Sequence, residues 1–281
     1  MIRRIHPKIG LPLARFLFSK TISRPSKNAY IFILGVPRSG TTLLQTRISK
    51  HSALFSPAAE TGFFRPDIFK RAKGWKGERQ KAFLGAQTQH RSLVKIFETF
   101  ANSLCPAKAR FVEKTPQHVR NLYWFLRMFP NSKVIHVYRD PRDLYASAKD
   151  NPNFAQGKNV DAFVRYYFKC MQGRIRAGRH PAILDVSYED LVSSPEASLA
   201  EIMGFLGESL EDHQLSAMSD PRSKSPAFSK LAGPITGESI HSYPKRISQD
   251  EASEVWDRCS PVYNRFCEVK MIYRELDHVS N

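Results

Sequence analysis

The sequence predicts an α/β fold of three layers, in which a mostly parallel central sheet carries helices on both faces. Four short apolar runs predict it, because each passes through a turn into a stretch whose apolar residues recur with the period of a helix. The glycine-rich and charged motifs of the chain stand in those turns, and parallel sheets bind their ligands at that edge. With 281 residues, 42% of them hydrophobic, the chain is long enough to bury one core.

Strands and helices are predicted in alternation. Strands are expected at residues 30–34, 110–112, 133–138 and 182–187. The helices that follow them are expected at residues 41–50, after Pro116, at 143–149 and at 195–206. Pro116 suits a first helical turn, and Gly207 is typical of a helix end.

Three further segments lie outside this alternation. Residues 57–103 are predicted to be helical and basic, and a helical pattern resumes between Val255 and Phe266. Residues 219–246 are rich in Ser, Pro, Gly and Lys, which disfavours regular structure. A loop of that length is usually disordered or a lid over a site. We interpret it as a lid, because periodic structure resumes after it.

The charge of the chain predicts an anionic partner. It carries 43 Lys and Arg against 26 Asp and Glu, a formal charge of +17. The first acidic residue is Glu60, and residues 1–59 hold ten of the basic side chains. We divide the chain into a basic arm over residues 1–27 and one domain over residues 28–281. The arm is open to three interpretations: a transit peptide, a basic helix on a membrane surface, or a solubilising extension.

The cysteines and the apolar runs indicate the compartment. No CxxC pair and no histidine at zinc spacing accompanies the cysteines, which are Cys105, Cys170, Cys259 and Cys267. We expect free thiols in a reducing compartment and no structural metal. The apolar stretch at residues 11–18 is far shorter than the roughly 20 residues of a membrane span. We therefore expect a cytoplasmic protein without a transmembrane anchor. Peripheral membrane contact through residues 1–27 is one of the three interpretations that stay open for the arm.

A glycine turn between the first strand and the first helix predicts an anion-binding site. The sequence GVPRSGTT at residues 35–42 places backbone N–H groups at a helix N-terminus, with hydroxyls from Ser39, Thr41 and Thr42. It nearly matches the phosphate loop of nucleoside triphosphatases, but Thr41 stands where their lysine does. This argues against an ordinary triphosphatase, whose lysine binds the phosphates. The alternative is that the glycines only close a sharp turn.

Three motifs together resemble one family. The sequence GVPRSGTTLL resembles the 5′-phosphosulfate-binding loop of sulfotransferases that use 3′-phosphoadenosine-5′-phosphosulfate (PAPS), in the form closest to the tyrosylprotein and bacterial carbohydrate-type branch. The sequence VIHVYRDPRDL at residues 134–144, with Ser147, is similar to the family's 3′-phosphate-binding segment. The sequence VSYEDLV at residues 186–192, with Pro195, matches its third recurrent block. The resemblance covers most of residues 30–207 and implies a P-loop NTPase-like sulfotransferase fold.

The resemblance also implies which residues bind PAPS. The 5′ end of the nucleotide is expected at Arg38, Ser39, Gly40, Thr41 and Thr42. The 3′-phosphate is expected at Arg139 and Ser147, with the adenine near Tyr188. Further candidates for the 3′ end are Ser239, Lys245 and Arg246.

Arg139 suits a phosphate on physical grounds as well. A guanidinium presents a planar fork of donors to a dianionic phosphate, and such a contact contributes about 1.5–3 kcal/mol. Ser147 lies one or two helical turns further along and could add a hydroxyl. The alternative is that Arg139 and Arg142 pair with Asp140 and Asp143 in the turn.

Sulfuryl transfer requires that charge on the leaving phosphate be neutralised, which basic side chains can do without a metal. We assign this role to Arg38 and Lys114. Lys114 stands in EKTP at residues 113–116, which resembles a catalytic-lysine segment of the family. The alternative for Lys114 is a surface lysine beside Glu113.

The reaction also needs a base for the acceptor proton. Cytosolic small-molecule sulfotransferases use a histidine two residues after the equivalent lysine, but Pro116 stands there in this chain. The tyrosylprotein and heparan-type branches use a glutamate downstream of the phosphate loop, and Glu60 stands 22 residues after Arg38. We assign Glu60 as the base, with a structural ion pair to Arg38 or another cation as the alternative. His118 and Glu113 are reserve candidates.

These residues together predict a PAPS-dependent sulfotransferase that needs no metal. Basic side chains within residues 65–81 and in the expected lid suit an acidic or polyhydroxylated acceptor. We favour the hydroxyl of a carbohydrate or glycolipid, with peptide tyrosine as the alternative. The rivals are a P-loop small-molecule kinase, a basic nucleic-acid-binding protein, for which we find no motif, and an inactive nucleotide-binding homologue.

Overall fold

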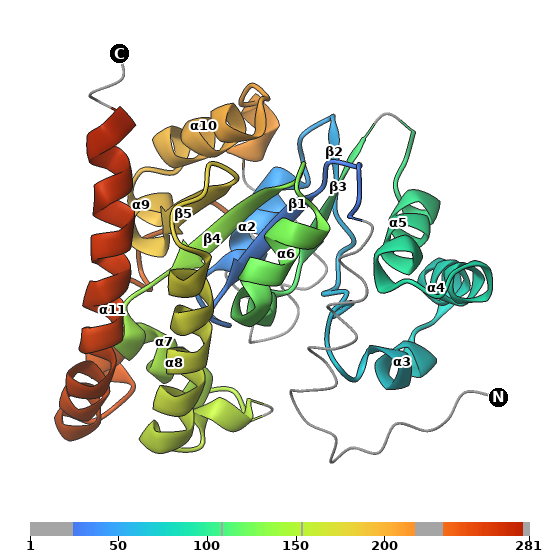
Figure 1. The fold of residues 1–281 in the computed structure, drawn as a ribbon. Coiled ribbons are helices and arrows are strands. Elements are labelled where there is room, and N and C mark those ends of the chain that lie inside the picture. Colours follow the sequence, from blue (N-terminus) through green and yellow to red (C-terminus); the bar gives the residue numbers. More distant parts are fainter. Residues whose placement is uncertain (1–24, 108, 153, 217–232, 278–281) are drawn as a thin grey trace.

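The computed structural model describes residues 25–107, 109–152, 154–216 and 233–277. Its centre is a five-stranded sheet in the order β2-β3-β1-β4-β5, in which every recorded pairing is parallel (Figure 1). The strands are β1 (Ile31–Gly35), β2 (Leu54–Phe55), β3 (Arg110–Lys114), β4 (Lys133–Tyr138) and β5 (Ile183–Ser187). The parallel sheet is confirmed, and the short edge strand β2 is an addition, because two residues carry no readable period.

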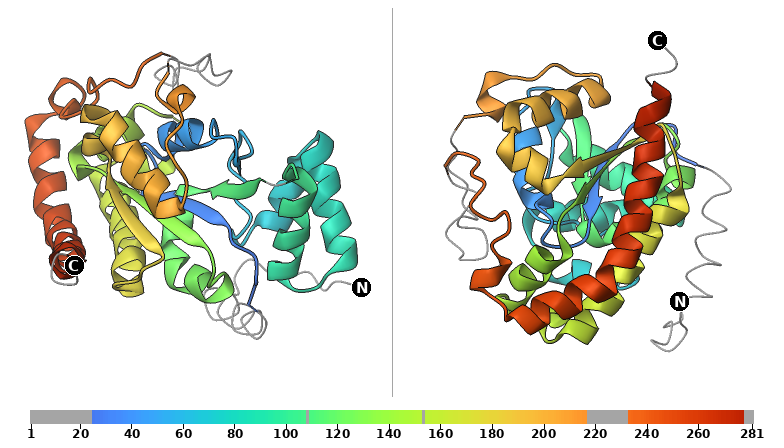
Figure 2. Two further views of the ribbon diagram at one scale, coloured as in Figure 1. Left: turned by 90° about the horizontal axis from the view of Figure 1, so that it is seen from above. Right: turned by 90° about the vertical axis from the view of Figure 1, so that its left-hand side faces the viewer.

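Helices cover both faces of this sheet, and the alternating side chains of β1 show how. Ile31 and Ile33 belong to a core shared with α2 (Thr41–Ile48), α9 (Tyr188–Ser193) and α10 (Pro195–Leu206). Phe32 and Leu34 belong to the opposite core, shared with α6 (Leu122–Met128), α7 (Pro141–Lys149), α8 (Val160–Ala177) and α11 (Gln249–Asp277). Figure 2 shows α10 and α8 on opposite sides of the sheet. The predicted three-layer α/β architecture is therefore confirmed.

The basic segment predicted to be helical stands beside the β2–β3 edge of the sheet (Figure 1). It contains α3 (Ile68–Arg71), the 3₁₀ turn η1 (Ala72–Gly74), α4 (Gly77–Gln89) and α5 (Leu93–Leu104). Buried aromatic rings attach it to the sheet: Phe97 stacks on Phe32 at 6.0 Å and meets Phe63 edge-on at 5.1 Å. Such pairs add to the free energy gained from area burial alone.

Short 3₁₀ turns complete the fold. They are η2 (Pro116–Asn121), η3 (Ala155–Gly157), η4 (Asp212–Gln214) and η7 (Tyr243–Lys245). The helix expected after Pro116 thus begins as η2 and becomes α6 only at Leu122. Of the expected lid, residues 217–232 lie outside the described residues, as do residues 1–24 of the expected arm.

Two further features concern the described residues as a whole. None of their helices is long and apolar enough to cross a membrane. The four cysteines are free, and within the described ranges no group of three or more His, Cys, Asp or Glu side chains could hold a metal ion.

Candidate functional site

The topology of the sheet gathers the sequence motifs at one edge. The chain leaves β1 toward β2 and β3 on one side and returns to β4 and β5 on the other, so the winding changes direction at β1. Ligands of parallel α/β sheets bind beyond the carboxyl ends of the strands at such a point. Gly35 and Lys114 end β1 and β3, and Arg139 directly follows β4. The candidate residues therefore meet at the predicted edge.

The glycine turn has a backbone that only glycine tolerates at two positions. A Cβ atom on Gly35 would lie 2.4 Å from the Val137 carbonyl oxygen of β4. Gly40 has φ of +94°, and a Cβ atom there would lie 2.4 Å from the Tyr188 ring. Arg38 also has a positive φ, of 81°, which is uncommon for a bulky residue and costs conformational free energy. The turn is thus tightly fitted between β4 and Tyr188.

Helix α2 begins directly after this turn. Gly40 occupies the N-cap position and makes no side-chain cap, so the backbone N–H groups of the first turn face the site. Thr41 is buried at the first position of the helix, and Thr42 is partly exposed. The hydroxyl of Ser39 is buried and has no hydrogen-bond partner within the described part of the chain. These donors are arranged as an anion-binding helix start requires.

Arg139 joins the second motif to the glycine turn. Its side chain is buried, and its Nη1 donates to the carbonyl of Arg38 at 3.3 Å. Its Nη2 donates to the carbonyl of Ser239. The guanidinium carbon lies 4.1 Å from the centre of the Tyr188 ring. Its Nε is buried without a partner among the described residues, which leaves one donor unused.

The sequence left open whether Arg139 pairs with an aspartate of its own turn, and the structure shows such a contact with Asp143. Asp143 lies 3.7 Å from Arg139, and its two oxygens also accept the backbone N–H groups of His241 and Tyr243 at 2.8 and 2.9 Å. Arg139 therefore shares this carboxylate with the described end of the expected lid.

The other arginine of the turn is fully engaged. Arg142 grips Asp140 with Nε and Nη2, at 3.1 and 2.6 Å, and lies between the rings of Tyr243 and Trp256. This is the structural ion pair that the sequence left open. It ties the start of α7 to η7 and α11.

Arg38 lies within a cluster of cations. Its Nε donates to the Ser147 hydroxyl of α7 at 3.0 Å. Burial, and then repulsion from Arg139 and Arg246, lower the pKa of Arg38. Arg246 itself donates from Nε to Asp150 at 2.7 Å, whereas Lys245 is exposed at the end of η7. A group of like charges held together in this way favours the binding of an anion.

The candidate base and the candidate catalytic lysine are in contact. Lys114 Nζ lies 2.9 Å from Glu60 Oε1 and donates to the Thr42 hydroxyl at 3.1 Å. The Lys114 side chain is only 3% exposed, whereas that of Glu60 is 43% exposed. The ion pair considered for Glu60 thus exists, and its partner is Lys114. Through Lys114 the carboxylate is linked to the start of α2.

The reserve candidates for the base are buried. Glu113 is 0% exposed and His118 is 1% exposed, so neither presents its side chain to an acceptor in solvent. Burial opposes the ionisation of Glu113, but the neighbouring His118, Thr115 and Thr61 hold its pKa below the usual value.

Arg79 is a site residue that the sequence interpretation missed. Its Nη2 donates to the carbonyls of Glu60 and Thr61 at 2.7 and 3.0 Å, and its guanidinium stacks 3.7 Å from the Trp75 ring centre. Burial lowers the pKa of Arg79 to about 10. The sequence showed Arg79 only as one basic residue among many in a helical segment.

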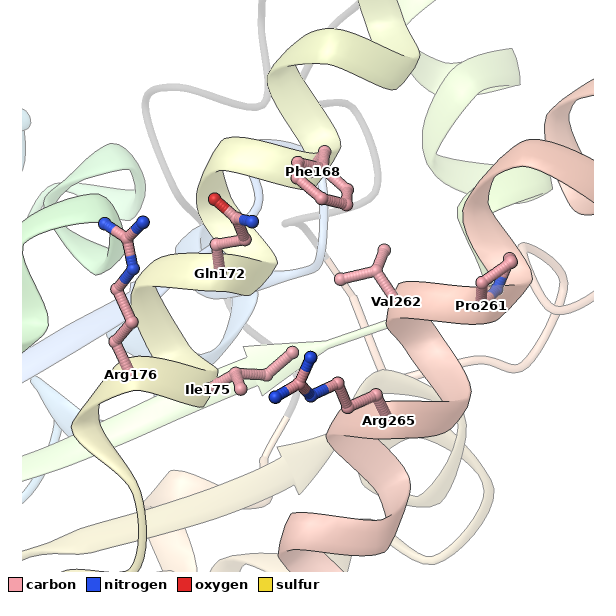
Figure 3. A pocket seen from close by; sticks show the side chains of 7 residues that line it. All are labelled: Phe168, Gln172, Ile175, Arg176, Pro261, Val262 and Arg265. Atoms are coloured by element: carbon pink, nitrogen blue, oxygen red, sulfur yellow. The ribbon is translucent and has the colours of Figure 1, made fainter.

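A separate hollow of about 290 Å³ lies between α8 and α11 (Figure 3). Its lining is mainly apolar and includes Phe168, Ile175, Pro261 and Val262. None of the candidate residues belongs to α8 or α11, so this hollow is not part of the candidate site.

Comparisons with known proteins agree with the motifs. Residues 30–212 match the model of the sulfotransferase family. The chain is 31% identical over 201 residues to protein-tyrosine sulfotransferase 2 of Gallus gallus, an alignment that covers 65% of this chain and 52% of that one. The chain spans about half or less of the length of such curated relatives.

The fold is similar to that of solved sulfotransferase structures. The sulfotransferase domain of the Synechococcus PCC 7002 olefin synthase aligns with a TM-score of 0.64 and 19% identity, covering 85% of this chain and 95% of that one. The mouse sulfotransferase SULT7A1 complexed with PAP aligns with a TM-score of 0.50 and 15% identity, covering 93% of each chain.

Proposed function

We propose that this protein, which belongs to the sulfotransferase family, transfers the sulfuryl group of PAPS to an acceptor hydroxyl. One observation carries the proposal: Arg139 Nη1 donates to the carbonyl of Arg38 at 3.3 Å. The arginine after β4 and the glycine turn after β1 are thus close enough for one adenine nucleotide to bridge them. Family membership leaves the kinase and the nucleic-acid-binding protein without support.

The residues at the turn fit the two phosphates of such a nucleotide. The buried Ser39 hydroxyl and the buried Arg139 Nε are donors without partners in the described part of the chain, and oxygen-rich anions satisfy such donors. We assign the 5′ end to residues 38–42 and the 3′-phosphate to Arg139 and Ser147. Besides burial and Arg139, repulsion from Arg246 lowers the pKa of Arg38, which supports a place for Arg246 near the nucleotide, at the 3′ end. Lys245 is assigned there only as its neighbour in the chain.

Tyr188 contacts both anion-binding segments. Its ring lies against the Arg139 guanidinium and against the backbone of Gly40. These contacts support its proposed place beside the nucleotide.

The chain supplies charge neutralisation and a base, whereas PAPS supplies the sulfuryl group. Lys114 and Arg38 offset charge on the leaving phosphate, together with the hydroxyls and N–H groups of Thr41 and Thr42. Glu60 accepts the proton of the acceptor hydroxyl, for which its half-exposed carboxylate is accessible. Lys114 lies between this carboxylate and the start of α2, so it joins the base to the anion-binding turn.

The acceptor that we favour is a carbohydrate or glycolipid hydroxyl. Exposed lysines of α3, η1 and α4 stand on the segment that Arg79 ties to Glu60, and they suit an acidic or polyhydroxylated molecule; they are Lys70, Lys73 and Lys81. Peptide tyrosine is the second candidate, because the chicken relative is a protein-tyrosine sulfotransferase. We further propose that the protein is cytoplasmic and contacts membrane surfaces through residues 1–27.

The decisive experiment is transfer from sulfur-labelled PAPS, in the presence of EDTA, to a panel of glycans, glycolipids and tyrosine peptides. We expect a labelled product from one class of acceptor. We also expect tighter binding of the product nucleotide 3′-phosphoadenosine-5′-phosphate (PAP) than of AMP, which lacks the 3′-phosphate. ATP with Mg²⁺ serves as the control donor. Transfer of phosphate instead of sulfate, or equal binding of PAP and AMP, would contradict the proposal.

A further inference from the structure

The last two residues of β3 bind two successive residues of the segment that carries Glu60. Lys114 pairs with Glu60 at 2.9 Å, and Glu113 accepts a hydrogen bond from the Thr61 hydroxyl at 2.5 Å. Neighbouring residues of a strand point to opposite faces of the sheet. The Glu60–Thr61 dipeptide is therefore attached on both faces of the end of β3, which fixes it against rotation as well as displacement.

The hydrogen bonds around Glu113 form a closed set. The Thr61 hydroxyl donates to Glu113 and accepts from the N–H of Phe63 at 3.1 Å. The Thr115 hydroxyl donates to the same carboxylate at 2.6 Å and accepts from the N–H of Gly62 at 2.9 Å. Each hydroxyl thus donates its one proton to Glu113 and accepts a hydrogen bond from a backbone N–H group with a lone pair. Residues 61–63 are fixed by this arrangement.

Burial makes these contacts hard to break. Glu113 is fully buried, and a buried carboxylate that loses a donor is costly because no water replaces it. His118 Nδ1 lies 3.3 Å from its second oxygen. Glu60 itself is half-exposed, so an accessible carboxylate stands on a rigid, buried support.

We propose that Thr61 and Glu113 are positioning residues for the transfer reaction, which hold the Glu60 carboxylate against Lys114. The inference rests on the proposed function. A base must stand within hydrogen-bond reach of the proton that it accepts, and a displacement of about 1 Å can lower a rate about a hundredfold. Without the Thr61 hydroxyl, the segment loses its bond to Glu113 and its bond from the N–H of Phe63. It keeps the Lys114–Glu60 ion pair, the Arg79 contacts and the Gly62 N–H bond to Thr115.

The test compares two substitutions of Thr61. Thr61→Val keeps the shape and removes the hydroxyl, whereas Thr61→Ser keeps the hydroxyl. With the acceptor found by the labelled-PAPS screen, we expect Thr61→Val to lower kcat about tenfold to a hundredfold, and Thr61→Ser to restore most of it. The affinity for PAP should stay within about twofold in both. Thr88→Val, which removes an exposed hydroxyl of α4 that donates to the Gly85 carbonyl at 2.8 Å, is the matched control.

A double-mutant cycle separates positioning from a general loss of structure. If Thr61 acts through Glu60, Thr61→Val should cost little more once Glu60→Gln is present. Equal losses in both backgrounds, or a kcat of Thr61→Val equal to that of the wild type, would overturn the inference while transfer by the wild type still supports the proposed function. If Thr61→Val does not fold by thermal melting, Glu113→Gln takes its place in the same cycle. Absence of transfer by the wild type would instead count against the proposed function.

Discussion

Two buried arginines flank the sheet, and their partners differ in kind. Arg174 of α8 donates from Nε and Nη2 to the two oxygens of Asp185 at 2.8 and 2.6 Å, and from Nη1 to the carbonyl of Gly178 at 2.8 Å. Its charge is thus matched by a carboxylate in a two-point contact, which is the strongest arrangement for this pair. His136 of β4 adds a further contact to Asp185 at 2.8 Å.

Arg139 is also buried, but it has no two-point contact with a carboxylate among the described residues. Its donors meet the carbonyls of Arg38 and Ser239, its Nε has no partner among the described residues, and Asp143 lies 3.7 Å away and is shared with backbone N–H groups. Carbonyls satisfy donors without cancelling charge. A buried arginine whose charge is matched by a carboxylate in a two-point contact therefore stabilises the fold. A buried arginine that faces carbonyls and other cations can bind an anion with its charge. The following predictions test this distinction.

The largest effect is expected in turnover, for a substitution at the candidate site that includes Arg139. Glu60→Gln removes the proposed base but keeps its size, so kcat should fall about 10²–10⁴-fold while PAP affinity changes little. Single-turnover transfer from labelled PAPS and calorimetric binding of PAP measure the two quantities. Unaltered turnover would remove Glu60 from this role.

A substitution at the Arg174–Asp185 pair should lower the stability of the fold instead of the turnover. Asp185→Asn removes the charge that balances Arg174 and leaves a buried guanidinium uncompensated, which typically costs about 3–5 kcal/mol of unfolding free energy. Urea unfolding followed by circular dichroism measures it. A variant as stable as the wild type would mean that the two arginines do not differ in the way that their partners indicate.

Arg139→Ala should weaken binding rather than folding. Loss of the contact with the proposed 3′-phosphate should cost about 1.5–3 kcal/mol, or about tenfold to 150-fold in the Kd of PAP. The Kd of AMP should change far less, because AMP lacks that phosphate. Equal losses for PAP and AMP would refute the assignment. Arg142→Ala is the matched control, because this arginine of the same turn is paired with Asp140.

The smallest effect is a loss of stability in mild acid that originates at His136. Burial lowers the pKa of His136, and Asp185 does not offset this fully because Arg174 already neutralises it. The unfolded chain therefore binds a proton near pH 6.5 more readily than the folded chain does, so His136 reduces stability as the pH falls below about 6.5. Melting temperatures at pH 7.5 and 5.5 measure it. His136→Gln should flatten this difference, and an unchanged slope would assign it to other groups.

Contiguous patterns explain what could be predicted of the site. The turn at residues 35–40, the arginine after β4 and the carboxylate at residue 60 each belong to one short stretch with its own signal. The partners could not be predicted in the same way. Lys114 and Arg79 reach Glu60 from 54 and 19 residues away. The sequence offered Arg38 or another cation as the partner of Glu60, and no local pattern distinguished among the basic residues.

The alternatives at the aspartates show the same limit. Arg139 and Arg142 stand three residues apart beside the same two aspartates, and no local rule says which one keeps a carboxylate. The position of the 239–243 segment decides it, because its N–H groups compete with Arg139 for Asp143, while Tyr243 and Trp256 enclose Arg142 on Asp140.

The sequence by itself determined the parallel α/β fold, the anion-binding turn and the edge of the sheet at which ligands bind, since the apolar periods, the glycine turn and the alternation of strands with helices each appear within short stretches of the chain. Only the tertiary structure decided which buried charges cancel and which stay available. Electrostatic energies depend on distance and burial through space rather than along the chain. Arg139 and Arg142, each followed by an aspartate, therefore differ in role: one is available to bind a ligand and the other stabilises the fold.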